Sequence, residues 1–257
     1  MRIFRLFILL VLAAAGGVGW WYREPLASVW KSKIGGTQLG ARPSLQPDPE
    51  SYATLTADLE RWRHELSKRY AAARDDEQRE VVERDARVVL EAALPALMHC
   101  WLGTPWDFNG TAKNPGEGQI ACGYFVATVL KDAGFQVDRF KLAQQPSENI
   151  LRSFLPKNSC SLDVGKDYQL FATDLGTRAP GIYIIGLDTH VAFVIVANGG
   201  FRFIHSSGSR PWCVVDETRD EAEVLKRSNW RMLGHLTADK TVLKRWLKQE
   251  KILVRGA

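Results

Sequence analysis

The stretch HVAFVIVANGGFRFIH, at residues 190–205, decides the fold. Two apolar runs flank Asn198 and Gly199, a dipeptide that prefers the two-residue turn of an antiparallel hairpin. With that turn the numbers of facing residues add up to 397, so His205 faces Ala192 and lies diagonal to His190 on the same face. Diagonal neighbours are about 7–8 Å apart, within reach of long side chains. A turn displaced by one residue would instead separate the two histidines.

Other elements surround this hairpin in the sequence. Short apolar runs predict three more strands, and these are Gly181–Gly186, the region of Val214 and Val215, and Trp230–Leu233. An apolar segment from Cys122 to Ala133, closed by Gly134, predicts a helix upstream of the strands. The polar segment between residues 135 and 179 is expected to be irregular. A helix followed by antiparallel strands indicates an α+β fold.

A helical hairpin is predicted before this core, in residues 51–87. Apolar residues recur there at spacings of three and four, as on one face of an amphipathic helix. Charged residues 74–77 separate this helix from a second one. The apolar positions are Tyr52, Leu55, Leu59, Trp62, Leu66 and Tyr70 in the first helix, and Val82, Val89, Leu90, Ala93, Leu94 and Leu97 in the second. The hairpin is expected to precede the core, residues 88–235, or to pack on it.

The N-terminus has the charge order of an export signal. Arg2 and Arg5 precede an uncharged stretch of 17 residues that ends at Tyr22. Residues 1–22 therefore predict a signal anchor or a cleaved signal peptide. We favour the anchor, because Trp20 and Trp21 extend the apolar run at a place typical of a membrane interface. Residues 23–50, rich in Gly and Pro, then form a linker. The expected location is the bacterial cell envelope, anchored in the inner membrane and facing the periplasm, or secreted after cleavage.

Composition excludes several classes of protein. Of the 257 residues 46% are hydrophobic and 25% are charged, which is typical of a globular domain and excludes a disordered or multi-span membrane protein. The net charge of +5 comes from residues 226–257, with nine Lys and Arg against two acids, whereas the rest carries 25 basic and 27 acidic groups. Residues 236–257 predict a basic C-terminal helix, from Thr237 to Val254. It could rest on an anionic surface or pack on the domain. Nucleic acid is not an expected partner, because the body lacks the basic surplus.

Cys122 is the candidate nucleophile. At the first turn of a helix its thiol meets unpaired backbone N–H groups, which are expected to lower its pKa and could also hold an oxyanion. The alternatives are an ordinary buried cysteine, or a disulfide with Cys100 or Cys160 in an oxidising compartment. The pairing of Cys100, Cys160 and Cys213 cannot be assigned from the sequence. The four cysteines show no C-x-x-C spacing, so no metal site is expected.

The candidate base is His190, because it opens a buried strand and so faces a pocket mouth rather than a core. His205 would hold the His190 ring in the useful tautomer, which gives a Cys-His-His arrangement for attack on a carbonyl. The alternative is a satisfied histidine pair at a strand edge. Of the other three histidines, His64 and His99 are expected to be surface or packing residues, and His235 has no motif around it.

The motifs resemble those of the NlpC-type cysteine peptidases, a papain-like family of bacterial cell-wall hydrolases. Residues 88–210 carry the likeness in LGTPW at 102–106, with Asn109-Gly110 where a Gly pair is usual, ACGYFV at 121–126 and KDAGF at 131–135. It continues in APG at 179–181, HV at 190–191 and FIHS at 203–206. The resemblance implies a papain-like fold with catalytic Cys122, His190 and His205. It also implies substrate contacts by Trp106, Asn109 and Gly123, the glycine allowing close approach.

Four residues depart from the family pattern. Ala121 replaces an Asp, Gly123 a Ser, Trp106 a Tyr and Ile182 an Asp, at positions that help to hold the peptide stem. The expected activity is therefore that of an exported cysteine amidase or endopeptidase, without a cofactor, that cleaves an amide in cell-wall peptide or a related substrate. A catalytically silent papain-like module that binds the wall or a partner protein is the alternative.

Overall fold

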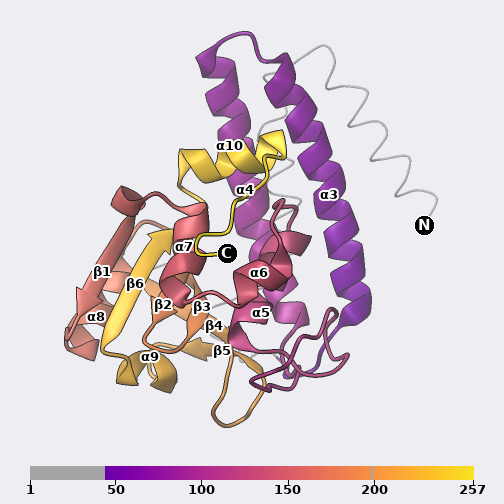
Figure 1. Ribbon diagram of the computed structural model, residues 1–257. Coiled ribbons are helices and arrows are strands. Elements are labelled where there is room, and N and C mark those ends of the chain that lie inside the picture. Colours follow the sequence, from indigo (N-terminus) through magenta and orange to yellow (C-terminus); the bar gives the residue numbers. More distant parts are fainter. Residues whose placement is uncertain (1–43, 198) are drawn as a thin grey trace. The chain divides into compact units, whose positions relative to one another are not determined.

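The protein is described from a computed structural model that covers residues 44–257 apart from Asn198. The predicted N-terminal membrane segment, residues 1–22, lies outside the described residues, as does the predicted linker up to residue 43. Within the described part no helix is both long and apolar enough to cross a lipid bilayer. The described residues belong to one compact unit with α+β architecture (Figure 1).

A six-stranded antiparallel sheet forms the centre of the fold, with strand order β1-β6-β2-β3-β4-β5. Five of its strands were predicted, and the structure confirms them with small shifts at the ends. The bounds are β1 Cys160–Val164, β2 Gly181–Leu187, β3 Val191–Ala197, β4 Gly200–Ser206, β5 Val214–Thr218 and β6 Trp230–His235.

The β3–β4 hairpin has the predicted register. Ala197 pairs with Gly200 and Phe193 with Ile204, so that facing residues add up to 397. Gly199 adopts a φ of 73°, the left-handed conformation that such a turn requires and that glycine adopts without steric cost. Asn198 lies outside the described residues. This register places His190 and His205 at the same end of the sheet.

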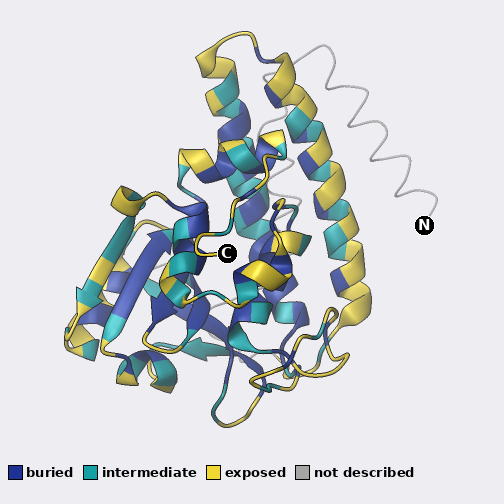
Figure 2. Ribbon diagram, viewed as in Figure 1, coloured by how far each residue is buried: buried dark blue, intermediate teal, exposed yellow. Residues whose placement is uncertain are grey.

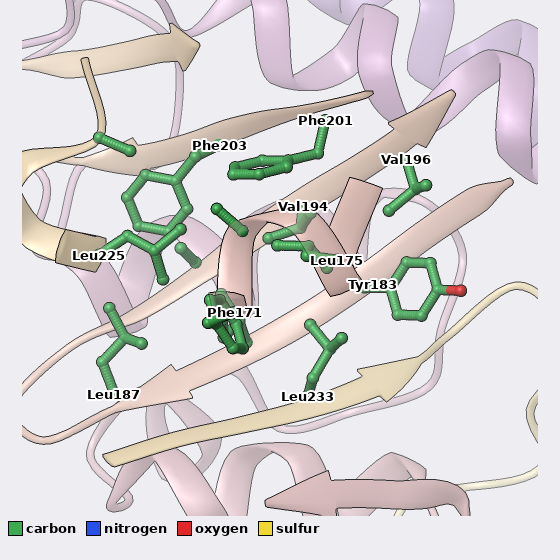
Figure 3. Packing of buried hydrophobic residues seen from close by; sticks show 14 residues of the cluster. Phe171, Leu175, Tyr183, Leu187, Val194, Val196, Phe201, Phe203, Leu225 and Leu233 are labelled. Carbon is green, nitrogen blue, oxygen red and sulfur yellow. The ribbon is translucent and has the colours of Figure 1, made fainter. Parts of the chain in front are cut away.

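Helices cover both faces of the sheet. One face packs against α8, Tyr168–Thr177, and α9, Glu223–Arg227, through a cluster that includes Phe171, Leu225 and Phe203 (Figure 3). The other face packs against α5, Cys122–Asp132, and α7, Ser147–Phe154. Because helices shield both sides, the residues of β2 are all buried, and the central strands are dark in Figure 2.

The predicted helical hairpin consists of α3, Pro49–Ala72, and α4, Asp76–Cys100. Aspartate side chains cap both N-termini, since Asp48 accepts a hydrogen bond from the Ser51 N–H and Asp75 from that of Gln78. Helix α4 continues across the predicted boundary between residues 87 and 88 and contacts α5 and β2. The hairpin thus packs on the core, the second of the two arrangements considered.

The C-terminal helix is shorter than predicted. Helix α10 covers Lys240–Lys248, because Gln249 turns into the left-handed region at φ 55°. The chain then runs beside residue 137, and the Ile252 N–H donates to the Gln136 carbonyl at 2.8 Å. Trp246 is buried and its Nε1 donates to the Ala133 carbonyl at 2.7 Å, while Lys240 pairs with Glu80 of α4. The helix therefore packs on the domain, which is one of the two arrangements predicted from the sequence.

The expectation of irregular chain between residues 135 and 179 is wrong. This segment contains β1, α7 and α8, together with α6, Arg139–Ala143, and a short 3-10 helix, Lys157–Ser159. Its elements have three to ten residues, too few for a periodic pattern to emerge from a polar sequence. Helix α7 is held by Ile150, Leu151 and Phe154, which are buried against the sheet. Tertiary packing, rather than local propensity, forms these short helices.

Candidate active site

The thiol of Cys122 lies at the N-terminus of α5, where the sequence placed it. The preceding residue, Ala121, offers no side-chain cap, so the first N–H groups of the helix have no side-chain acceptor. The backbone N–H groups of Val191, Gly123 and Cys122 itself interact with the sulfur and favour its thiolate. Cys122 thus lies beside the first residue of β3, next in sequence to His190.

The expectation of a lowered thiol pKa is wrong. Burial raises the pKa of Cys122 above its usual value of 9.0, and the backbone N–H groups only partly offset that effect. Desolvation disfavours a thiolate, and at this position it outweighs the helix N-terminus. The resting side chain at neutral pH is therefore a protonated thiol, and catalysis would need a base that removes its proton during attack.

The loop before Cys122 is fastened to the sheet. Ser206, the last residue of β4, donates its hydroxyl to the Ile120 carbonyl at 2.6 Å. The Ile120 N–H in turn donates to the Pro105 carbonyl at 2.9 Å, and the Ala121 N–H to that of Gly110 at 2.9 Å. These bonds hold the nucleophile helix against the strand end that carries His205.

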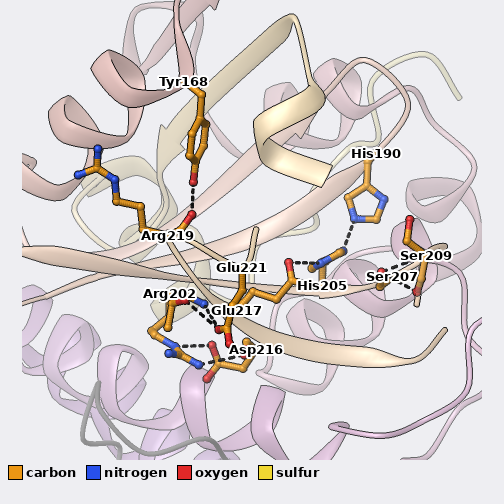
Figure 4. A network of polar contacts seen from close by, with 11 residues as sticks. Tyr168, His190, Arg202, His205, Ser207, Ser209, Asp216, Glu217, Arg219 and Glu221 are labelled. Carbon is orange, nitrogen blue, oxygen red and sulfur yellow. Dashed lines mark hydrogen bonds and ion pairs between the residues drawn. The ribbon is translucent and has the colours of Figure 1, made fainter. Parts of the chain in front are cut away.

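The two predicted histidines meet as the register requires. His190 Nε2 and His205 Nδ1 are 2.8 Å apart, and the rings are nearly perpendicular at 88° (Figure 4). His205 has no exposed surface, and burial lowers its pKa to about 3. Burial, followed by repulsion from His205, lowers the pKa of His190 well below its usual value. Both imidazoles are thus neutral at physiological pH, as a resting base must be.

Glu217 of β5 extends this pair. Its Oε2 lies 3.1 Å from His205 Nε2, on the side of the ring opposite His190 (Figure 4). Burial raises the pKa of Glu217 to about 7, with further contributions from the negative charges of Glu221, Glu223 and Asp216. Sequence reasoning missed this residue, because the loop between β4 and β5 sets no register by itself. Its only signal was an acidic residue in a strand whose neighbours Val214 and Val215 are apolar.

A second ion network lies behind the first. Asp216 accepts from Arg202 Nε at 2.7 Å, and its other oxygen lies 2.9 Å from His99 Nε2. The Asp216 and Arg202 side chains are buried, and His99 is half-buried at the end of α4. Arg202 lies on the face of β4 opposite His205, since side chains alternate along a strand. This network fixes β5 to β4 and to α4, and so fixes the backbone of Glu217.

The Cys122 thiol meets the backbone at the start of β3, through the Val191 N–H, and not the His190 ring. No hydrogen bond joins Cys122 to His190 in the described part of the chain, although the thiol touches the Val191 N–H. Because Nε2 of His190 is engaged with His205, Nδ1 is the nitrogen left for the thiol. Catalytic hydrogen bonds are often long before substrate binds and tighten in the complex.

The three predicted substrate contacts have different surroundings. Trp106 is partly exposed and its ring lies 5.5 Å from that of Trp212, which is half exposed. Asn109 is exposed in the loop before Cys122, and its N–H donates to Asp107. A Cβ on Gly123 would lie 2.3 Å from the carbonyl oxygen of Ala143. Gly123 thus packs closely against α6, and its predicted role of admitting a substrate stays a prediction.

The remaining cysteines and histidines do not join the site. All four cysteines are free thiols, so the structure holds no disulfide of Cys122 with Cys100 or Cys160. His64 is exposed, and His235 stacks on Tyr183 with ring centroids 4.0 Å apart. No group of three or more potential metal ligands occurs among the described residues.

No family model, curated protein or solved structure matches this chain. The class that the fold itself defines is an α+β protein with a six-stranded antiparallel sheet and eight α-helices in its described part. Its candidate site combines a helix N-terminal cysteine with a buried His-His-Glu chain.

Proposed function

We propose that the protein is a cysteine hydrolase of the cell envelope, with a papain-like core of the NlpC type, that cleaves an amide bond in cell-wall peptide. One observation carries the proposal. A histidine pair joined at 2.8 Å stands at the strand end where a helix N-terminal cysteine is fastened. In this proposal the N-terminal segment anchors the chain in the inner membrane, facing the periplasm, or is cleaved to release it.

The proposed chemistry begins at the thiol. His190 Nδ1 accepts the proton of Cys122 as the sulfur attacks the carbonyl carbon, and the carbonyl electron pair moves to oxygen. The backbone N–H groups at the start of α5, which lack a side-chain cap, would stabilise that oxyanion. His190 then gives the proton to the leaving amine. Water, activated by the same ring, hydrolyses the thioester and restores the thiol.

An aromatic pair near the loop before Cys122 supports the substrate class. Trp106, with Trp212 beside it, offers an aromatic surface next to the loop that leads to Cys122. The Trp106 N–H donates to the Trp212 carbonyl at 2.8 Å, which ties the two aromatic residues together. Aromatic rings at a site mouth favour the apolar parts of a ligand over charged groups. Trp106 and the exposed Asn109 are the proposed substrate contacts.

The test is digestion of purified peptidoglycan with the full chain, followed by mass analysis of the fragments. We expect new amines and carboxylates with the unaltered protein and none with Cys122→Ala. Cys160→Ala is the matched control, since its thiol is also partly buried but lies in β1, away from the site. Fragments that persist in Cys122→Ala would overturn the assignment of the nucleophile.

A second candidate function is a catalytically silent binding module of the envelope. The raised pKa of Cys122 and the absence of a thiol–imidazole bond within the described residues favour it. Retention of the full chain and of Cys122→Ala on insoluble peptidoglycan, with no cleavage by either, would select this function.

A further inference from the structure

Three polar side chains are joined by two contacts across successive strands. His190 precedes β3, His205 lies in β4 and Glu217 in β5, and the distances between their facing atoms are 2.8 Å and 3.1 Å. The register explains both contacts. His205 faces Val215, so Glu217 is its diagonal neighbour, just as His190 is diagonal to His205 on the other side.

We propose that Glu217 is a positioning residue whose carboxylate fixes the tautomers of both histidines and so makes His190 able to act as a base. This inference rests on the proposed function for its consequence, although the tautomers exist whether or not the protein is an enzyme. The residue touches neither thiol nor substrate, and it acts through His205.

The geometry determines the direction of every donor. An ionised carboxylate can only accept, so His205 Nε2 must carry the hydrogen. His205 Nδ1 is then bare and accepts from His190 Nε2 at 2.8 Å. His190 Nδ1 consequently keeps its lone pair, which is what removal of the thiol proton requires.

Protonation of Glu217 removes this constraint. Its acid group can then donate to His205 Nε2, which moves the hydrogen of His205 to Nδ1 and the hydrogen of His190 to its own Nδ1. A His190 that carries hydrogen on Nδ1 has no lone pair for the thiol. The change takes up one proton from solvent. This proton binds His190 Nδ1, the hydrogen on His190 Nε2 passes to His205 Nδ1, and the hydrogen on His205 Nε2 passes to the Glu217 carboxylate.

The surroundings of Glu217 put this change near neutral pH. On its own face Glu217 meets His205 of β4, and Glu221, Glu223 and Lys226 of α9 and the turn before it contribute their charges. Asp216, the preceding residue of β5, adds a negative charge from the opposite face. Asp216 is itself paired with Arg202 and His99. Burial together with the surplus of negative charge raises the pKa of Glu217 to about 7.

The experiment is nitrogen NMR of the full chain labelled with ¹⁵N-histidine, which separates the hydrogen-bearing from the bare ring nitrogen. The His190 and His205 signals are assigned with His190→Gln and His205→Gln. Between pH 8.5 and pH 5.5 we expect the hydrogen of both rings to move from Nε2 to Nδ1, with a midpoint near 7. Glu217→Leu should give pH-independent tautomers in both rings.

Glu223→Gln is the matched control. It removes a neighbouring negative charge at an exposed position and leaves the His205 contact in place. The tautomers at pH 8.5 should be unchanged, and the midpoint should fall below that of the unaltered protein. Tautomers that stay constant in the unaltered protein over this pH range would overturn the proposal, even if Glu217→Leu fails to fold.

The pH profile of peptidoglycan cleavage separates the two proposals. If both hold, kcat/KM falls at acid pH with the same midpoint as the tautomers, and Glu217→Gln loses that limb. If the histidine tautomers depend on Glu217 but no cleavage occurs, the hydrolase proposal is refuted and the positioning role of Glu217 remains. If cleavage occurs but the tautomers do not depend on Glu217, the positioning role is refuted and the hydrolase proposal remains.

Discussion

For each individual side chain of the candidate site, burial determines which protonation state is favoured. It raises the pKa of Cys122 and Glu217 and lowers that of His190 and His205, so in each case the neutral form is favoured. A thiolate–imidazolium pair is therefore not the resting state. In the proposed hydrolase, the proton would leave the thiol only during attack on the substrate.

The pH dependence of Cys122 alkylation follows from this resting state. With iodoacetamide, we expect the rate at Cys122 to keep rising above pH 9, because burial raises the pKa of the thiol above 9.0. At pH 7.5 the thiol should react more slowly than glutathione. Mass analysis of the Cys122 peptide measures the rate, and the partly buried Cys160 serves as the internal comparison. A rate that is already constant between pH 6 and pH 8 would show a preformed thiolate instead.

Helix α10 joins parts of the chain that are distant in sequence, and this is the main feature at the scale of elements. Its buried face, with Trp246 and Leu243, packs on α3 and α4, while Trp246 Nε1 bonds to the residue that ends α5. Gly134, at φ 94°, lies directly under the Trp246 ring, where a Cβ would come within 3.2 Å of Nε1. The basic helix is thus structural on one side and solvated on the other.

Trp246→Ala should destabilise the fold. Removal of a fully buried tryptophan costs about 3–5 kcal/mol in free energy of unfolding, and the loss of its hydrogen bond to Ala133 adds to this. Urea unfolding followed by circular dichroism measures the change. Lys248→Ala, on the half-exposed side of the same helix, should change stability by less than about 0.5 kcal/mol. A cost under about 1 kcal/mol for the tryptophan would mean that α10 does not hold the hairpin to the core.

Elements with strong local signals could be predicted from the sequence. Asn198-Gly199 fixed the register of β3 and β4, and so the diagonal contact of His190 with His205. The two long amphipathic helices were also predictable from their periodic apolar faces, and the helix that begins at Cys122 from its apolar run and the glycine that ends it.

The missed features depend on contacts between distant segments. Glu217 joins the site because β5 pairs with β4 after a loop that has no turn signature. The short helices α6 and α7 exist because their apolar residues pack on other parts of the chain, and β1 exists because its backbone pairs with β6. The pKa of Cys122 was predicted in the wrong direction because the helix N-terminus is visible in sequence, whereas the burial of the thiol is not.

Stability of the whole molecule should depend on the buried acid. Folding raises the pKa of Glu217 from 4.5 to about 7, so its favourable contribution is present below pH 4.5 and is lost as the pH rises through 7. Each pKa unit corresponds to ~1.4 kcal/mol. Above pH 7, Glu217→Gln should therefore unfold at a higher urea concentration than the unaltered protein. Its free energy of unfolding should be larger by about 1–3 kcal/mol.

The same comparison at pH 3 supplies the control, because this pH lies below both pKa values, Glu217 is neutral in both folded and unfolded chains, and the advantage of Glu217→Gln should vanish. Glu223→Gln, fully exposed, should show no comparable pH-dependent gain. An advantage of the glutamine that stays equal at both pH values would contradict a buried ionisation.

The contacts between diagonal neighbours on adjacent strands also determine the spacing of these residues in the sequence. His190 and His205 are separated by 15 positions, and His205 and Glu217 by 12. The first interval is set by a tight turn and tolerates no insertion, whereas the second includes a loop and can vary in length. Chains that share this centre should therefore be recognisable by two histidines at a fixed interval, followed by an acid at a variable one, even where the remaining residues have diverged.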